Sequence, residues 1–233
     1  MRLLFYLLLC MILVGCGRQA TPSDSDDPPS SMQSEQTSSE RTVAEKVEES
    51  VAEAQVADAA PKVEYANLTP IDAVTNFIEG IVNDNFDQAK SAVVFDEKVK
   101  TYLMANIESV RAMDGYAQAD NEYFGKEGAV PVGSMRTSML KRLGNAKAVL
   151  IDDDHAEVTL GSPTPMKLVK HADGWKIDFT GPESEKLLET VPRVFGDTAK
   201  VFNQVRQGIV DGTIKTREEA SQEMKRLKAK YRL

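Results

Sequence analysis

The spacing of apolar residues changes sharply near Gly144, and this change restricts the folds that the chain can adopt. Before Gly144 the apolar residues recur every three or four positions, which predicts helices that bury one face. From Ala146 to Phe179 they alternate with polar residues, which predicts strands with one buried face. Helices followed by several short strands predict an α+β domain, in which the helices pack on an antiparallel sheet.

The first half of the domain carries several helix boundary signals. Thr69 and Asp72 have the spacing of a capping box, with Pro70 in the first turn between them. Residues 116–132 have no regular period, and we expect an irregular loop there. The expected helices begin at Pro70, at Asp84 or Asn85, at Asp96 with a stop at Gly115, and at Met135 with an end at Gly144.

The second half is expected to form an antiparallel meander of four strands. The first two strands are joined across Asp152–Asp154, and the last two turn at Asp173-Gly174, where we expect both residues to have positive φ. The expected strands are Ala146–Ile151, His155–Leu160, Met166–Lys170 and Trp175–Phe179.

Residues 182–233 are expected to form a C-terminal helical hairpin. Thr190 and Pro192 are typical of a helix start, and Gly212 of a helix end. Thr216–Glu219 is a second capping box, which predicts a last helix with a narrow apolar stripe. The hairpin packs either on its own domain or on a partner, and we favour its own domain.

The N-terminus has the pattern of an exported protein. Arg2 precedes an uncharged run, Leu3–Leu13, which is shorter than the roughly 20 residues of a membrane-spanning helix. The run ends in Leu13-Val14-Gly15-Cys16, which resembles the lipobox of bacterial lipoproteins. The alternative is an ordinary secretory signal peptide in which Cys16 is incidental.

The lipoprotein resemblance implies a signal peptide over residues 1–15, cleavage between Gly15 and Cys16, and a lipid on the Cys16 thiol. Two or more acyl chains give stable membrane anchoring, whereas one chain does not. Gly17 follows the cysteine where Asp would favour retention, so we expect the outer membrane, with the protein facing the periplasm. Cys10 would leave with the signal peptide, so we expect neither a free thiol nor a disulfide in the mature chain.

Residues 16–65 are expected to be the lipidated cysteine followed by a disordered acidic linker. Ser, Asp, Glu and Pro dominate this segment, which has little apolar surface to bury. Residues 17–65 hold four basic and eleven acidic residues, a net charge of −7, while residues 66–233 hold 23 basic and 25 acidic residues, a net charge of −2. The folded part therefore has no basic excess for nucleic acid, and we expect no nucleic-acid partner.

The stretch Lys170–Phe179 (KHADGWKIDF) and the order of elements resemble the nuclear transport factor 2-like, or cystatin-like, superfamily, which includes small bacterial lipoprotein domains of unknown function. The resemblance covers residues 66–181 and implies a curved, cone-like sheet, with one further long strand whose position stays open. Enzymes of this superfamily place an Asp, Tyr or His inside the cone. The corresponding candidates are Tyr102, Tyr116, Tyr123 and Asp178.

Other chemically capable residues have simpler explanations. His155 and His171 lie beside expected turns, and three consecutive aspartates at 152–154 lack the spaced ligands of a calcium loop. The basic residues of the last helix complement a helix C-terminus, although contact with anionic headgroups or cell-wall polymers is an alternative. These residues are Lys225, Arg226, Lys228, Lys230 and Arg232. Protease, nucleophile-elbow, P-loop and dinucleotide motifs do not occur, so we expect no metal or cofactor.

These observations favour a non-catalytic, lipid-anchored envelope protein that binds a partner protein or a small ligand. The alternatives are a pocket enzyme of the isomerase or cyclase type, and an assembly role for the C-terminal hairpin. An interior filled by apolar side chains would favour the binding module, and a deep pocket with a buried, uncompensated Asp or Tyr would favour the enzyme.

Overall fold

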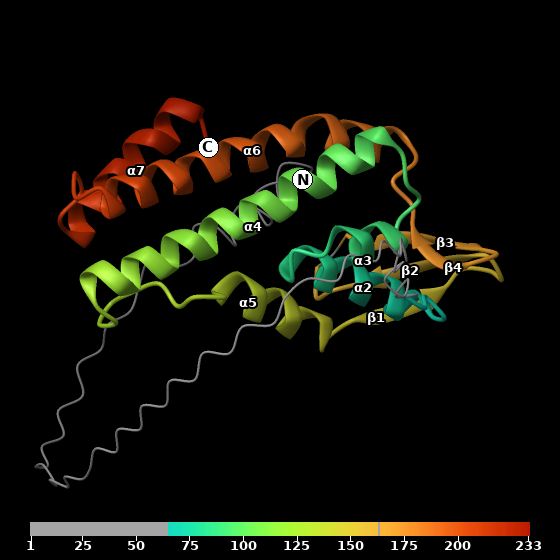
Figure 1. The fold of residues 1–233 in the computed structure, drawn as a ribbon. Coiled ribbons are helices and arrows are strands. Elements are labelled where there is room, and N and C mark those ends of the chain that lie inside the picture. Colours follow the sequence, from blue (N-terminus) through green and yellow to red (C-terminus); the bar gives the residue numbers. More distant parts are fainter. Residues whose placement is uncertain (1–64, 163) are drawn as a thin grey trace, which may run out of the picture. The chain divides into compact units, whose positions relative to one another are not determined.

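The computed structural model describes residues 65–162 and 164–233. The expected signal peptide, the cleavage site at Gly15–Cys16 and nearly all of the acidic linker lie outside the described residues. The described chain has the expected α+β architecture (Figure 1). Its elements are α2 (Pro70–Val82), α3 (Phe86–Ser91), α4 (Glu97–Phe124), α5 (Ser134–Leu143), β1 (Lys147–Leu150), β2 (His155–Thr159), β3 (Met166–His171), β4 (Gly174–Ile177), α6 (Pro182–Val210) and α7 (Arg217–Tyr231).

The four strands form one antiparallel sheet in the order β1-β2-β3-β4, as the alternation predicts. Trp175 and Ile177 point into the core, and Lys176 lies on the opposite, more solvent-exposed face of the sheet. Helix α2 packs against the sheet, and its capping box is present, with Thr69 and Asp72 bonding each other's backbone N–H. Asn85, rather than Asp84, caps α3, because its side chain accepts a hydrogen bond from the N–H of Gln88.

The turn between β3 and β4 differs from the expected one. His171 pairs with Gly174, so Ala172 and Asp173 occupy the turn, and only Gly174 has a positive φ, of 118°. A side chain on Gly174 would also meet the backbone of Asn67, whose carbonyl accepts a hydrogen bond from the Trp175 N–H. Glycine is therefore required here by the close approach of the preceding segment as well as by its backbone angle.

Helix α4 is longer than the sequence predicts, because it continues through Gly115 to Phe124. The loop expected over residues 116–132 is consequently confined to the segment between α4 and α5. A glycine within a helix costs about 1 kcal/mol relative to alanine, and it does not end this one because the following turns are packed. Tyr116, Ala117 and Ala119 are all buried.

Helix α6 begins at Pro182, two turns before the expected start, and contains Pro192 in its interior. Leu188 and Val191, which precede the proline, are buried in the same core as the sheet. Packing of this first segment therefore outweighs the loss of one backbone hydrogen bond at Pro192. The helix ends at Val210, next to the expected Gly212, and the second capping box starts α7 at Arg217.

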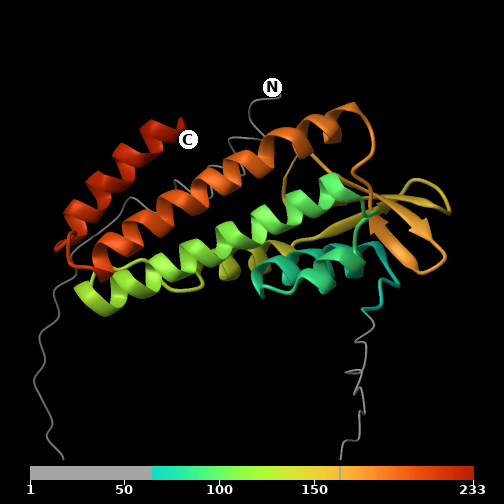
Figure 2. The same ribbon diagram turned by 45° about the horizontal axis from the view of Figure 1, so that its top comes forward.

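Helices α4 and α6 run side by side, and α7 lies along the C-terminal part of α6 (Figures 1 and 2). The core has two parts. One is formed by the sheet, α2, α3, the N-terminal half of α4 and the start of α6. The other joins the C-terminal halves of α4 and α6 to Ala220 and Leu227 of α7. The hairpin thus packs on its own domain, as favoured, and α4 contributes to both parts.

Candidate functional site

Tyr102 is buried inside the domain, among aromatic side chains. Its ring is 5.4 Å from that of Phe179, 6.2 Å from that of Phe195 and 6.5 Å from that of Phe77, between ring centroids. Burial raises the pKa of Tyr102 to about 12, and a hydrogen bond with Asn106 opposes this rise. The phenol is therefore held neutral in an aromatic cluster that fills the interior.

The other proposed pocket residues do not join Tyr102. Tyr116 lies further along α4 and packs on Phe202 of α6, and burial, followed by the charge of Asp120, raises its pKa. Tyr123 is half exposed. Asp178 lies on the face opposite Trp175, as predicted, where it accepts hydrogen bonds from the N–H and hydroxyl of Thr180. The four candidates therefore form no common site.

The two histidines are exposed residues at strand ends, His155 at the start of β2 and His171 at the end of β3, and the aspartate run is exposed in the turn before β2. Asp152 accepts hydrogen bonds from the N–H groups of Asp154 and His155 and also contacts the His155 ring, at 2.8 Å from Nδ1. These interactions lower the pKa of Asp152. Within the described residues, no group of three or more His, Cys, Asp or Glu side chains could hold a metal ion.

The basic residues of α7 mostly contact their own helix or α6. Arg226 forms an ion pair with Glu223 at 2.6 Å, Lys228 lies over the ring of Phe202, and Lys230 lies over the ring of Tyr231. Burial lowers the pKa of Lys228. Several positive charges of α7 therefore already interact with carboxylate or aromatic groups of the hairpin itself.

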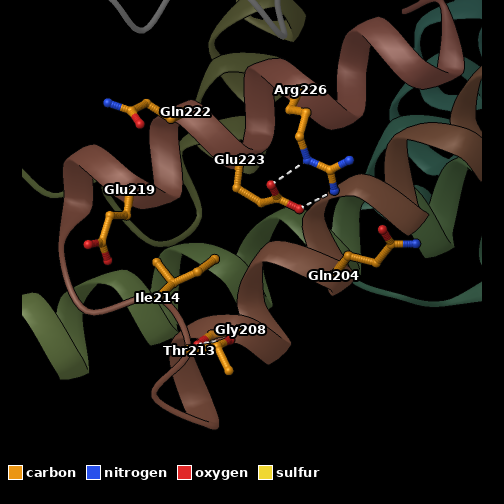
Figure 3. Close-up of a pocket in the computed structure, with 8 residues that line it drawn as sticks. All are labelled: Gln204, Gly208, Thr213, Ile214, Glu219, Gln222, Glu223 and Arg226. Atoms are coloured by element: carbon orange, nitrogen blue, oxygen red, sulfur yellow. Dashed lines mark hydrogen bonds and ion pairs between the residues drawn. The ribbon is translucent and has the colours of Figure 1, made fainter.

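A hollow of about 500 Å³ lies between α6 and α7 and is lined by eight residues (Figure 3). Figure 3 shows Glu223 and Arg226, both of α7, paired with each other along the α7 side of the hollow. The Glu219 carboxylate beside it accepts the N–H groups of Lys215 and Thr216 at the start of α7. Its charged groups are thus already engaged in the hairpin.

A second, larger hollow of about 650 Å³ is a groove lined by residues of α2, α4, α5 and α6. Ile81, Ile107 and Val110 contribute apolar surface, and Val132, at the rim, is 56% exposed. Its charged lining residues are Arg111, Arg136, Arg206, Asp84 and Asp114. We call this hollow the arginine groove.

The two carboxylates of the arginine groove already have partners. Asp84 pairs with Arg111, whose Nε donates to Oδ2 at 3.0 Å, and this interaction raises the pKa of Arg111. Asp114 accepts the N–H of Gly133 at 3.1 Å. Among the described residues, Arg136 and Arg206 make no ion pair.

Gly115 gives Arg206 its place in the groove. A Cβ at residue 115 would lie 3.4 Å from the Arg206 Cδ and 3.5 Å from its Nε, so the arginine side chain lies against the bare backbone of α4. The prediction of a helix end at Gly115 is wrong, because α4 runs through this residue and the groove forms beside it. An isolated glycine within an amphipathic helical pattern can also mark a close approach, and that was the available signal.

A buried carboxylate occurs at Asp120, but it is compensated. Its Oδ1 accepts from the Arg217 Nε at 2.9 Å, and its Oδ2 accepts the N–H of Val130 at 3.2 Å. In the described part of the chain, every buried side-chain nitrogen or oxygen has a hydrogen-bond partner. Asp120 is therefore accounted for as a structural group.

Two further observations bear on identity. None of the described helices is both long and apolar enough to cross a membrane. No family model, no curated protein and no solved structure matches this chain, and its resemblance to the nuclear transport factor 2-like superfamily stays a prediction.

Proposed function

We propose that this chain is a bacterial lipoprotein whose folded domain is a non-catalytic binding module, held at the cell envelope by lipid on Cys16. Support for the anchor comes from Arg2, the apolar run Leu3–Leu13 and the Leu13–Cys16 motif. We place the protein at the outer membrane, facing the periplasm, because Gly17 follows the lipidated cysteine. Its acidic linker would keep the domain clear of the membrane surface.

The packed interior supports binding rather than catalysis. An enzyme of the isomerase or cyclase type needs a substrate cavity with a base or acid of shifted pKa. At Tyr102, the space that such a cavity would take is filled by Phe77, Phe179 and Phe195. Asp120, the buried acid, is neutralised by Arg217.

The arginine groove is the observation that carries the binding proposal. It combines apolar lining residues with Arg136 and Arg206, two guanidinium groups that have no carboxylate partner among the described residues. Arginine binds carboxylates and phosphates through paired hydrogen bonds. We therefore propose that the groove binds an acidic segment of an envelope protein, or a small anionic ligand.

Site-specific photo-crosslinking in intact cells tests this proposal. A photoreactive amino acid replaces Val132 at the groove rim, and a matched control replaces Met104, which is outside the groove but equally exposed, at 55% against 56%. We expect a discrete adduct from residue 132 and none from residue 104.

The arginines supply the second part of the test. We expect the residue 132 adduct to fall at least tenfold in the double variant Arg136→Ala, Arg206→Ala. The adduct should persist in Arg193→Ala, which removes an exposed arginine that lies on α6, as Arg206 does, but outside the groove. An adduct that does not depend on Arg136 and Arg206, or equal labelling from residue 104, contradicts the proposed site.

A further inference from the structure

The two edges of the sheet differ in how they are covered. At the β4 edge, the Trp175 and Ile177 N–H groups donate to the carbonyls of Asn67 and Ala92, at 2.9 and 2.8 Å. At the β1 edge, no segment of the described chain pairs with the strand on the side away from β2. Strand β1 is therefore the open edge of the sheet.

This open edge is apolar. Val149, Leu150 and Ile151 are 58%, 64% and 60% exposed, and all four residues of β1 are exposed. Lys147 is the one charged residue of the strand. Soluble proteins usually protect an edge strand with charges, proline or a bulge, because its unpaired backbone groups attract further strands.

The register identifies the backbone groups that face outward. The Ile151 N–H donates to the His155 carbonyl at 2.9 Å, so residues 151, 149 and 147 point their backbone groups towards β2. By alternation, the N–H and C=O of Ala148 and Leu150 point away from the sheet. The open edge thus presents two donors and two acceptors in one row.

From this geometry we infer that β1 pairs with β1 of a second copy of the chain, antiparallel and with the two-fold axis at Val149. In this register Ala148 lies opposite Leu150 of the other copy, so all four outward groups on each strand are paired. The two strands join the sheets into one sheet of eight strands. Such an isologous contact is closed and limits assembly to a dimer.

The sequence of the strand is self-complementary in this register. The large Leu150 meets the small Ala148, Val149 meets Val149, and Lys147 meets Ile151 rather than another lysine. Sliding the pairing by two residues towards the N-terminus would place Lys147 opposite Val149 and Ala148 opposite Ala148. In that slid register Leu150 would lie opposite Ala146, whose N–H already donates to the Leu143 carbonyl, so backbone pairing favours a second copy in the register centred on Val149.

Disulfide crosslinking of the full chain in cells tests this inference. In Val149→Cys the two thiols would face each other at a non-hydrogen-bonded pair, with Cβ atoms roughly 4.5–5.5 Å apart. Lys167→Cys is the matched control, because it lies on the same sheet face, in the row formed by Val149, Glu157 and Lys167. In the proposed dimer, the two Lys167 positions are about five strand spacings apart, or roughly 24 Å.

We expect at least tenfold more oxidised dimer from Val149→Cys than from Lys167→Cys or from the parent chain, which controls for Cys10 and Cys16. Equal yields, or an adduct of Val149→Cys with a different protein, would overturn the inference. Charge reversal provides an independent readout. Val149→Lys or Val149→Glu alone should lower the dimer fraction in sedimentation, and an equal mixture of the two should restore it; no change in either would also overturn the inference.

Discussion

Arg217 and Asp120 form an ion pair of 2.9 Å across 97 residues of sequence, and the Asp120 side chain is completely buried. The same guanidinium donates to the carbonyl of Gly125 at 2.8 Å, just beyond the last residue of α4. Arg217 therefore holds the start of α7, the end of α4 and the following loop together.

Removing Arg217 should destabilise the domain strongly. In Arg217→Met the apolar stem is retained while Asp120 becomes a buried carboxylate without its counter-ion, which costs about 3 kcal/mol. Urea unfolding should show this as a lower midpoint with an unchanged slope. A loss below about 0.5 kcal/mol, typical of a surface pair, would contradict the structural role of Arg217.

A double-mutant cycle with Asp120→Asn separates the pair from the rest of the Arg217 contacts. We expect the two changes to be coupled by about 1–3 kcal/mol, because the residues are in direct contact. The Arg226→Met variant is the control. Arg226 pairs with Glu223 of its own helix near the surface, so this substitution should lower the free energy of unfolding only slightly. Additive effects of Arg217→Met and Asp120→Asn would exclude the ion pair as the source of the stability.

The raised pKa of Tyr102 should make the free energy of unfolding depend on pH in the alkaline range. Its pKa is raised from 10.0 to about 12 by burial, so between these values the unfolded phenol loses its proton while the folded one keeps it. The contribution of Tyr102 to the free energy of unfolding is therefore fully present below pH 10. It is lost as the pH rises towards 12, by about 2–3 kcal/mol in total. Urea midpoints between pH 8.5 and 11.5 should fall less in Tyr102→Phe than in the parent chain. Parallel profiles would show that Tyr102 is not buried as described.

Substituting alanine for each of two helical glycines should change the free energy of unfolding in different directions. A Cβ at Gly80 would lie 2.3 Å from the backbone nitrogen of Ala89, whereas at Gly115 it would meet only the flexible side chain of Arg206. We expect Gly80→Ala to cost more than about 2 kcal/mol through overpacking. Gly115→Ala should be neutral or stabilising by up to about 1 kcal/mol, because alanine favours the helix. Thermal unfolding of both variants checks this, and a large loss in Gly115→Ala would contradict the helical assignment of that residue.

Local signals predicted much of the fold. The capping residues Thr69, Asp96 and Thr216 each begin a helix where expected, and the alternation around Trp175 identified the buried face of the sheet. These signals act over a few residues, so they can be recognised without knowing the tertiary contacts. The errors at Gly115 and Pro192 have one cause. Both residues weaken a helix locally, and in both places packing between α4, α6 and the core outweighs that local preference.

The arginine groove could not be derived from the sequence in the same way. Arg136 and Arg206 lie 70 positions apart, on α5 and α6, and they line one groove only because both of these helices pack beside α4. Long-range pairs such as Arg217 and Asp120 depend on the same arrangement. Prediction of these groups requires the packing of α4 against α6, which the apolar pattern of either helix does not specify.

We propose that lipid on Cys16 presents this domain at the envelope, and intact-protein mass spectrometry of the membrane fraction tests this proposal most directly. We predict a chain that begins at Cys16, with added mass equal to a diacylglyceryl group, alone or with one further acyl chain. The variant Cys16→Ser should lack this mass and leave the membrane fraction or retain its signal peptide. A membrane-derived protein that begins at Met1, or one with an unmodified Cys16, would contradict the account.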